Sequence, residues 1–298
     1  MCITTASLLN TTKPGGLFED MLSMSKVIIG DEASQIPEPA LVAMLGRFPL
    51  AKHIYIGDVN QLEPHVRCPR SSRAARLGAK GIMELLMAKE TPLVQLVTTY
   101  RAHPALNALP NRLVYDGDLV SGTPARRRQM LTSHAKLPNP ELPLVVIDVP
   151  GRSRLSPSQS HSNEQEAQCC KELIRGLIAK DIPAASIGVI TFYKDQQRLM
   201  EEAAAKLGVH LFTVDSVQGR EMDIVVILTT RTTVDRSSGE FIDDLKRLNV
   251  AITRCRHGLF ILANVGALHD LHNWGTLIHW AYEHRTVITE SQLPDIFA

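Results

Sequence analysis

The feature that most constrains this chain is a series of short apolar runs separated by segments of helical length. The runs lie at residues 26–30, 53–57, 93–97, 144–149, 186–191, 223–229 and 258–263. Strands that are apolar at consecutive positions are typical of a parallel sheet with helices on both faces. Helical patterns occupy residues 38–48, 80–89, 163–180, 194–207 and 274–284. The alternation therefore predicts an α/β fold of right-handed βαβ units.

Three polar stretches interrupt this alternation. Residues 65–80 are basic and polar, and residues 151–162 are rich in serine, which predicts a flexible connector. Residues 121–143 contain several prolines and the run Arg126-Arg127-Arg128. We interpret this third stretch as a long surface loop with solvated arginines.

Composition excludes several classes of protein. The formal net charge is +1, so neither a strongly basic nucleic-acid coat nor an acidic tail is present. The 5 cysteines include no C-x-x-C pair, which argues against a disulfide framework or a zinc site. No apolar run approaches the roughly 18 residues of a membrane-spanning helix, and the start of the chain lacks the pattern of a signal peptide. We expect a cytoplasmic protein, with the nucleus as the alternative.

Carboxylates follow the first two predicted strands. Asp31 and Glu32 come directly after residues 26–30, and Asp58 follows residues 53–57. The carboxyl ends of parallel strands meet at one edge of the sheet, where open α/β folds bind ligands. An Asp-Glu pair by itself is more often a solvated strand end, but a second acidic strand end favours a site for a nucleotide and a metal ion. One carboxylate can hold Mg²⁺ through water while the next polarises a water molecule.

Several segments together resemble the motifs of superfamily 1 helicases, in the branch typified by the nonsense-mediated-decay RNA helicase. In chain order they are Asp31-Glu32-Ala33-Ser34-Gln35 (motif II), Gly57-Asp58 to Gln61-Leu62 and Pro64 (motif III), Tyr100-Arg101-Ala102-His103-Pro104 (motif IV), Ile190-Thr191-Phe192-Tyr193 with Gln196, Val214 to Glu221 (motif V) and Arg247 to Arg254 (motif VI). The order is that of the family. Ala102 and Phe192 depart from its usual Met and Pro.

This resemblance implies a RecA-like parallel sheet flanked by helices, as in P-loop NTPases. Residues 1–92 would form the last part of a truncated first lobe, and residues 93–298 a nearly complete second lobe. The family's phosphate-binding loop is missing, because only 30 residues precede Asp31 and Lys13-Pro14-Gly15-Gly16 does not fit its pattern. The sequence would then be a fragment, a degenerate paralogue, or a chain completed by another. An exposed sheet edge and apolar surface are expected in the first lobe.

The resemblance also implies roles for side chains around ATP and Mg²⁺. Asp31 and Glu32 would hold the metal ion, and Glu32 would activate water. Gln35 and Gln61 would sense the γ-phosphate. Arg101 would bind that phosphate, and Arg254, projecting from the second lobe, would act as an arginine finger. Tyr100 would stack on adenine, although a tyrosine at the core edge is equally plausible, and Glu221 would bind the ribose hydroxyls.

A single-stranded nucleic acid is the implied partner, with RNA favoured over DNA by analogy. Thr191, Ser216 and Gln218 would contact its phosphate backbone. The basic run Arg67, Arg70, Arg73, Arg76 and Lys80 is either a second contact or a solvated surface. Protein partners of an RNA-decay or surveillance complex are also expected. The implied function is that of an ATP-dependent helicase, and the alternative is a catalytically inactive module that binds nucleic acid or protein.

Overall fold

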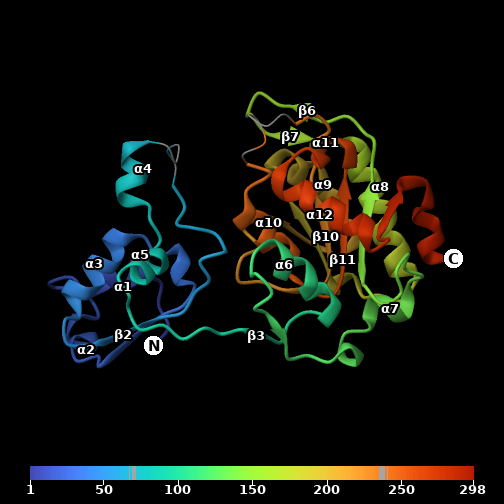
Figure 1. Ribbon diagram of the computed structural model, residues 1–298. Helices are drawn as coiled ribbons and strands as arrows, with labels where there is room; N and C mark the ends of the chain where they lie inside the picture. Colours follow the sequence, from blue (N-terminus) through green and yellow to red (C-terminus); the bar gives the residue numbers. More distant parts are fainter. Residues whose placement is uncertain (67, 69–71, 235–238, 240) are drawn as a thin grey trace. The chain divides into compact units, whose positions relative to one another are not determined.

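The computed structural model describes residues 1–66, 68, 72–234, 239 and 241–298, and the chain divides into two compact units, Met1–Gln95 and Leu96–Ala298 (Figure 1). The sequence placed this division between residues 92 and 93. The predicted strand at residues 93–97 is wrong, because the first strand there is β3 (Thr98–Thr99). Leu93, Val94 and Leu96 are 52%, 84% and 81% exposed. These apolar residues lie in the connection between the units, where no strand of the described chain pairs with them.

The second unit is built on a six-stranded parallel sheet, which confirms the predicted α/β fold with a RecA-like parallel sheet (Figure 1). The strands, in their order across the sheet, are β12 (Val287–Thr289), β5 (Leu144–Asp148), β11 (Cys255–Ala263), β10 (Met222–Leu228), β8 (Ile187–Thr191) and β9 (His210–Thr213). The four central strands follow the predicted apolar runs. The two edge strands were not predicted, because they are short and their sequences mix polar with apolar residues.

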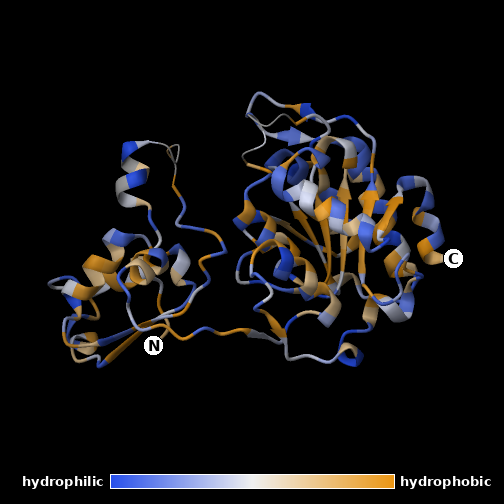
Figure 2. Ribbon diagram, viewed as in Figure 1, coloured by the Kyte–Doolittle hydropathy of each residue, from blue (hydrophilic) through white to orange (hydrophobic). Residues whose placement is uncertain are grey.

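Both faces of this sheet are buried under helices. Alternate residues of β10 point to opposite faces, and Val225 and Val226 are both fully buried. Figure 2 shows the apolar strands inside a more polar shell of helices. The helices and 3₁₀ turns of this unit are η2 (Pro104–Asn107), α6 (Ala108–Leu113), η3 (Ala125–Arg127), α7 (Met130–His134), α8 (Glu164–Ala179), η4 (Ala184–Ser186), α9 (Lys194–Leu207), α10 (Leu245–Ile252), α11 (Val265–His269), α12 (His272–Glu283) and η5 (Glu290–Phe297).

Two small sheets lie outside the main one. Strand β3 pairs in parallel with β4 (Val120–Ser121). Strands β6 (Arg154–Leu155) and β7 (His161–Ser162) form an antiparallel hairpin. The stretch 151–162 is therefore a hairpin rather than the predicted flexible connector. Asp195 explains part of the difference, because its backbone N–H donates to Ser160 Oγ at 3.1 Å and ties the hairpin to α9.

The first unit contains a two-stranded parallel sheet of β1 (Val27–Gly30) and β2 (Lys52–Tyr55). Its helices are α1 (Thr5–Thr11), α2 (Glu19–Ser23), η1 (Ala33–Gln35), α3 (Glu38–Arg47), α4 (Arg73–Gly78) and α5 (Ile82–Ala88). Leu41, Met44 and Ile82 are among the buried residues of its core. Ile29 and Ile54 are 63% and 49% exposed. These two side chains form part of the apolar surface that the sequence predicts for the first lobe, where the parallel sheet is short. In the described ranges of both units, no helix is both long enough and apolar enough to span a membrane.

Candidate functional site

The acidic ends of β1 and β2 lie at the same edge of the first unit's sheet. The parallel register pairs Gly30 with Tyr55, so both loops leave the sheet together. The Ala33 N–H donates to the Ile56 carbonyl at 2.8 Å, which ties one loop to the other. A Cβ at Gly57 would lie 2.9 Å from the backbone nitrogens of Ala33 and Ser34. Glycine at position 57 therefore lets the two loops approach closely.

Glu32 has a backbone conformation that non-glycine residues rarely adopt. Its φ is +50° and its ψ is +42°, in the left-handed region. Its backbone N–H is bound by Asp31 Oδ1 at 3.0 Å. Such strain persists where the surrounding structure fixes it, and functional sites are where it is usually found. Asp31 and Glu32 offer the hard oxygen ligands that Mg²⁺ requires, so the donor set fits that ion.

The loop after β2 is braced by Asp58. Its Oδ1 accepts from the Asn60 N–H at 2.9 Å, and its Oδ2 accepts from Gln61 Nε2 at 3.0 Å. These bonds hold the Gln61 amide, which is half-buried, at the acidic edge. Gln35 closes η1 at the same edge and is exposed. The structure thus brings Asp31, Glu32, Gln35 and Gln61, four predicted site residues, to one end of the first unit.

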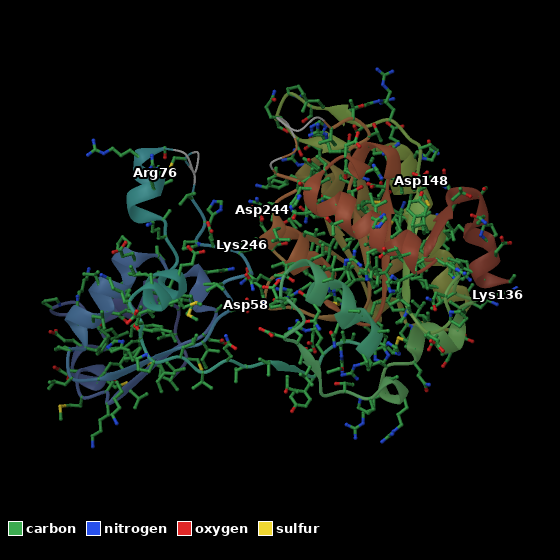
Figure 3. The ribbon with its side chains drawn as sticks, viewed as in Figure 1. Asp58, Arg76, Lys136, Asp148, Asp244 and Lys246 are labelled. Atoms are coloured by element: carbon green, nitrogen blue, oxygen red, sulfur yellow. The ribbon has the colours of Figure 1, made fainter. Side chains whose placement is uncertain are left out.

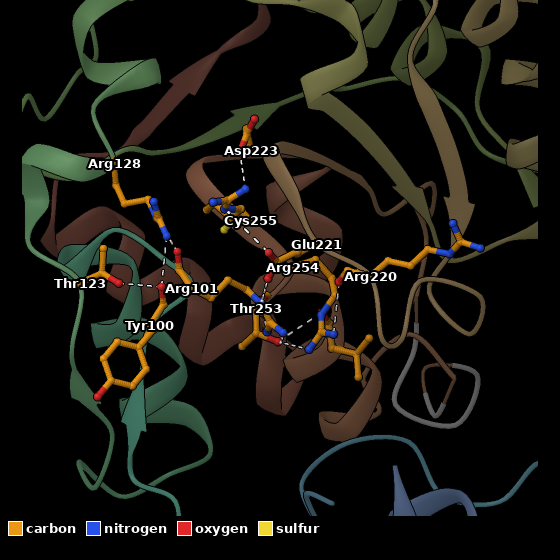
Figure 4. Close-up of polar contacts among 12 residues, drawn as sticks. Tyr100, Arg101, Thr123, Arg128, Arg220, Glu221, Asp223, Thr253, Arg254 and Cys255 are labelled. Carbon is orange, nitrogen blue, oxygen red and sulfur yellow. Dashed lines mark hydrogen bonds and ion pairs between the residues drawn. The ribbon is translucent and has the colours of Figure 1, made fainter. Parts of the chain in front are cut away.

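A second group of predicted residues meets at the amino edge of the second unit's sheet (Figure 4). Arg101 Nε donates to Glu221 Oε2 at 2.9 Å, and Arg101 Nη1 donates to the Thr253 carbonyl at 3.0 Å. Glu221 lies directly before β10, and Thr253 caps α10. Segments that are more than a hundred positions apart in the sequence therefore share one hydrogen-bonded network.

Glu221 is the electrostatic centre of this network. The hydrogen bond from Arg101 holds the pKa of the Glu221 carboxyl below its usual range, and the charges of Arg101, Arg256 and Arg128 act in the same direction. Arg256 lies 3.8 Å from Glu221 Oε1 and 3.4 Å from Asp223 Oδ1. The site is a cationic cluster around two carboxylates, and it can offer planar donors to an anionic ligand.

Arg254 is enclosed rather than projecting. The residue is 1% exposed. Its Nε donates to the Val250 carbonyl at 3.0 Å, and its Nη2 donates to Thr253 Oγ1 at 3.0 Å. The sequence predicted a side chain that projects from its unit, and that part of the prediction is wrong. A guanidinium two residues after the end of a helix can fold back onto the last turn, where backbone carbonyls lack helical partners.

Tyr100 carries an exposed ring on a fixed backbone. The residue is 67% exposed. Its carbonyl accepts from Thr123 Oγ1 at 2.6 Å and from Arg128 Nη2 at 3.1 Å. Exposure argues against the alternative that Tyr100 is a core-edge residue. Arg128 is half-buried within this cluster, so its interpretation as a solvated loop residue is wrong.

The predicted nucleic-acid residues differ in their accessibility. Thr191, at the end of β8, is fully buried, and its Oγ1 donates to the Tyr193 carbonyl at 3.1 Å. This hydroxyl is not available to a phosphate, which corrects the prediction for Thr191. Ser216 is exposed, and its Oγ both donates to the Thr213 carbonyl and accepts from the Thr213 N–H at 3.0 Å. Gln218 is half-buried in the same loop, before Gly219 with φ +75°.

The basic run gives a divided result. Arg67 and Arg70 lie outside the described residues. Arg76 on α4 is exposed, and Figure 3 shows its side chain extending away from the helix. A hollow of about 650 Å³ is lined by Glu63, Arg73, Ala75, Arg76, Ala79, Lys80 and Glu84. Its lining carries both signs of charge, with Arg73, Arg76 and Lys80 beside Glu63 and Glu84.

Sequence reasoning missed other members of the site. Arg128, Arg256 and Asp223 surround Glu221, but no short motif marks them. Tyr115 lies in the segment after α6. Its hydroxyl accepts from Asn249 Nδ2 at 2.8 Å, so it fixes α10 beside the segment after α6. A polar side chain at a fully buried helix position, such as Asn249, is the signal that could have indicated such a partner.

Comparison with known proteins gives matches over most of the chain. A family model described as an AAA domain matches residues 79–266. The mouse protein named 5'-3' DNA helicase ZGRF1 is 34% identical over 260 residues, which cover 85% of this chain. The Arabidopsis thaliana protein named regulator of nonsense transcripts 1 homolog is 30% identical over 273 residues, which cover 88% of this chain. The chain spans only 13% and 21% of the lengths of these two relatives.

A solved structure also matches this chain at low similarity. It is that of an arterivirus nonstructural protein 10, a helicase, in complex with DNA. The identity is 17% and the TM-score is 0.44, over 84% of this chain and 42% of that chain.

Proposed function

Because the chain belongs to the AAA domain family, which forms the C-terminal part of superfamily 1 helicases, we propose that it is part of an ATP-dependent helicase. In this proposal the chain contributes to the binding and hydrolysis of ATP and to movement along a single-stranded nucleic acid. The observation that supports it most directly is the network of Arg101, Glu221 and Thr253, with the exposed ring of Tyr100 beside it.

The side chains of this network suit a nucleoside triphosphate. Arg101 offers the planar donors that match phosphate oxygens, and its side chain is 33% exposed. Tyr100 would stack on adenine, and Glu221 would exchange part of its bond with Arg101 for the ribose hydroxyls. Arg254 would stabilise charge on the transferred phosphoryl group, which requires its guanidinium to leave the Val250 carbonyl.

The acidic edge of the first unit suits the metal ion and the attacking water. In this proposal Asp31 and Glu32 hold Mg²⁺, which would neutralise charge on the phosphates. Glu32 accepts a proton from water, and Gln35 and Gln61 contact the γ-phosphate. The braced amide of Gln61 supports this role, because its position is set by Asp58 before any ligand binds.

We propose single-stranded RNA as the favoured nucleic acid, because several relatives are named regulators of nonsense transcripts, and DNA as the alternative. Ser216 and Gln218 are the proposed backbone contacts. A cytoplasmic or nuclear location and partners from an RNA surveillance complex follow from the same analogy.

A second candidate function is a catalytically inactive binding module. The sequence favours it in one respect, because it contains no Gly-x-x-x-x-Gly-Lys-Ser/Thr pattern, whose backbone and lysine hold the β- and γ-phosphates. We expect negligible ATP turnover by the 298-residue chain for that reason. A single-turnover assay tests this expectation, and robust turnover that Glu32→Gln abolishes would contradict it.

The proposed nucleotide site is tested by ATP binding rather than by turnover. Arg101→Ala should weaken ATP binding by about tenfold or more, because it removes a charged donor to phosphate. Arg112→Ala is the matched control, since Arg112 forms an exposed ion pair with Glu283. Ligand-detected NMR titration measures both. Equal affinities for wild type and Arg101→Ala would refute the assignment.

A further inference from the structure

The exposed ring of Tyr100 lies against the backbone of Gly122. A Cβ at position 122 would lie 2.3 Å from Tyr100 Cε1 and 2.6 Å from Cδ1. Gly122 is fixed in turn, because its N–H donates to the Thr99 carbonyl at 2.8 Å, next to the β3–β4 pair. The ring therefore occupies space that any other residue at position 122 would fill.

One guanidinium binds two consecutive carbonyls of the backbone beneath the ring (Figure 4). Arg128 Nε donates to the Arg101 carbonyl at 2.6 Å, and Arg128 Nη2 donates to the Tyr100 carbonyl at 3.1 Å. Thr123 Oγ1 supplies a second donor to the Tyr100 carbonyl at 2.6 Å. The Tyr100 carbonyl belongs to the Tyr100–Arg101 peptide plane, which begins at the Tyr100 Cα. A rigid fork bound to this carbonyl and to the next one fixes the orientation of that plane, and so it restricts the direction in which the Tyr100 ring points.

Arg101 depends less on this fork than Tyr100 does. The Arg101 side chain has its own anchors in Glu221 and the Thr253 carbonyl. Tyr100 is 67% exposed, and its ring hydroxyl forms no hydrogen bond with the residues that the structure describes. Loss of the fork should therefore loosen the ring more than the Arg101 guanidinium.

We propose that Arg128 is a positioning residue that holds Tyr100 as a preformed stacking platform for the base of a nucleotide, with Gly122 and Thr123 completing the support. This inference rests on the proposed nucleotide site. It assigns a role to the segment 122–128, whose arginines sequence reasoning placed on a solvated loop. Preformed orientation matters because an exposed aromatic side chain otherwise loses rotamer freedom when a ligand binds.

The test compares ATP with inorganic triphosphate in ligand-detected NMR titrations. Wild type should bind ATP about tenfold more tightly than triphosphate, because stacking on the base adds affinity. Arg128→Ala should remove most of that difference, and it should also weaken the binding of both ligands because it takes one positive charge out of the cluster. Arg128→Lys keeps the charge, so it should leave the affinity for triphosphate within about twofold. It should still remove most of the difference, because an ammonium group cannot bridge both carbonyls. Arg126→Ala is the control, as Arg126 is an exposed neighbour on η3.

Tyr100→Ala distinguishes a failure of the proposed stacking site from a failure of the proposed role of Arg128. If the advantage of ATP over triphosphate survives Tyr100→Ala, or is absent in wild type, the proposed stacking site fails. If Tyr100→Ala removes it but both Arg128 variants keep it, only the role of Arg128 fails. If Arg128→Ala unfolds the protein in thermal melts, Gly122→Ala is the second variant. Its Cβ displaces the ring and should also remove the advantage, and an unchanged advantage would overturn the proposal.

Discussion

Glu166 is a fully buried carboxyl in the second unit, and it should make that unit less stable as pH rises. The residue is 1% exposed. It accepts hydrogen bonds from the Thr230 N–H at 2.7 Å and from Gln196 Nε2 at 2.9 Å. Burial nevertheless dominates and raises the pKa of Glu166 from 4.5 to about 8. The perturbation that exposes this cost is Glu166→Gln, which removes the titrating group at nearly constant volume.

The sign and size follow from linkage between protonation and folding. Because the folded pKa is the higher one, the stabilising contribution is fully present below pH 4.5 and is lost as pH rises through about 8. Between the unfolded and the folded pKa, each pH unit lowers the free energy of unfolding by about 1.36 kcal/mol. Through this group, wild type should therefore lose roughly 4 kcal/mol of stability between pH 5 and pH 9. Glu166→Gln lacks that loss. It costs about 1–2 kcal/mol at every pH instead, because its amide N–H₂ faces the Gln196 donor.

The assay is urea unfolding at pH 5, 7 and 9, followed by tryptophan fluorescence. Both tryptophans, Trp274 and Trp280, are buried in the second unit, so the signal reports that unit. Glu166→Gln should be less stable than wild type at pH 5 and more stable at pH 9. Glu201→Gln on α9 is the control, since Glu201 is exposed. If the stability difference between wild type and Glu166→Gln is the same at all three pH values, the reasoning is refuted.

Three further predictions concern the acidic edge of the first unit's sheet, the amino edge of the second unit's sheet, and the binding of nucleic acid. Gly57→Ala should destabilise the first unit by about 1–3 kcal/mol, because its Cβ would lie 2.9 Å from two backbone nitrogens. Circular dichroism melts measure this loss, and an unchanged melting transition of the first unit would contradict the prediction. Arg254→Ala should cost about 2 kcal/mol in the second unit, because it removes the hydrogen bonds of the guanidinium to the Val250 carbonyl and to Thr253 Oγ1. Tryptophan-detected urea unfolding measures this cost against Arg126→Ala. Binding to labelled single-stranded oligonucleotides should weaken with salt and tolerate changes of sequence, so a salt-independent affinity in titrations at two ionic strengths would count against backbone contacts.

One part of the site could be predicted from local sequence pattern, namely that the two acidic loops of the first unit lie at one edge of the sheet. Two apolar strands, each followed by a carboxylate, predict parallel neighbours whose ends share an edge, and the pairing of β1 with β2 has that form. The same reasoning failed at residues 93–97. Apolar character predicts burial but not a partner strand, and Leu93, Val94 and Leu96 have neither.

The sequence by itself determined the α/β class, the four central strands of the large sheet and the residue types gathered at each edge, because periodicity and composition act over short stretches of chain. Only the tertiary structure decided which of those residues contact one another and which are accessible to a ligand. The ion pair of Arg101 with Glu221 spans 120 positions. Thr191 lost its accessibility, and Arg128 gained its place beneath Tyr100, through neighbours brought together by the packing of the sheet and its helices. Hydrogen bonding and desolvation depend on distances between atoms, and residues far apart in sequence acquire those distances only on folding.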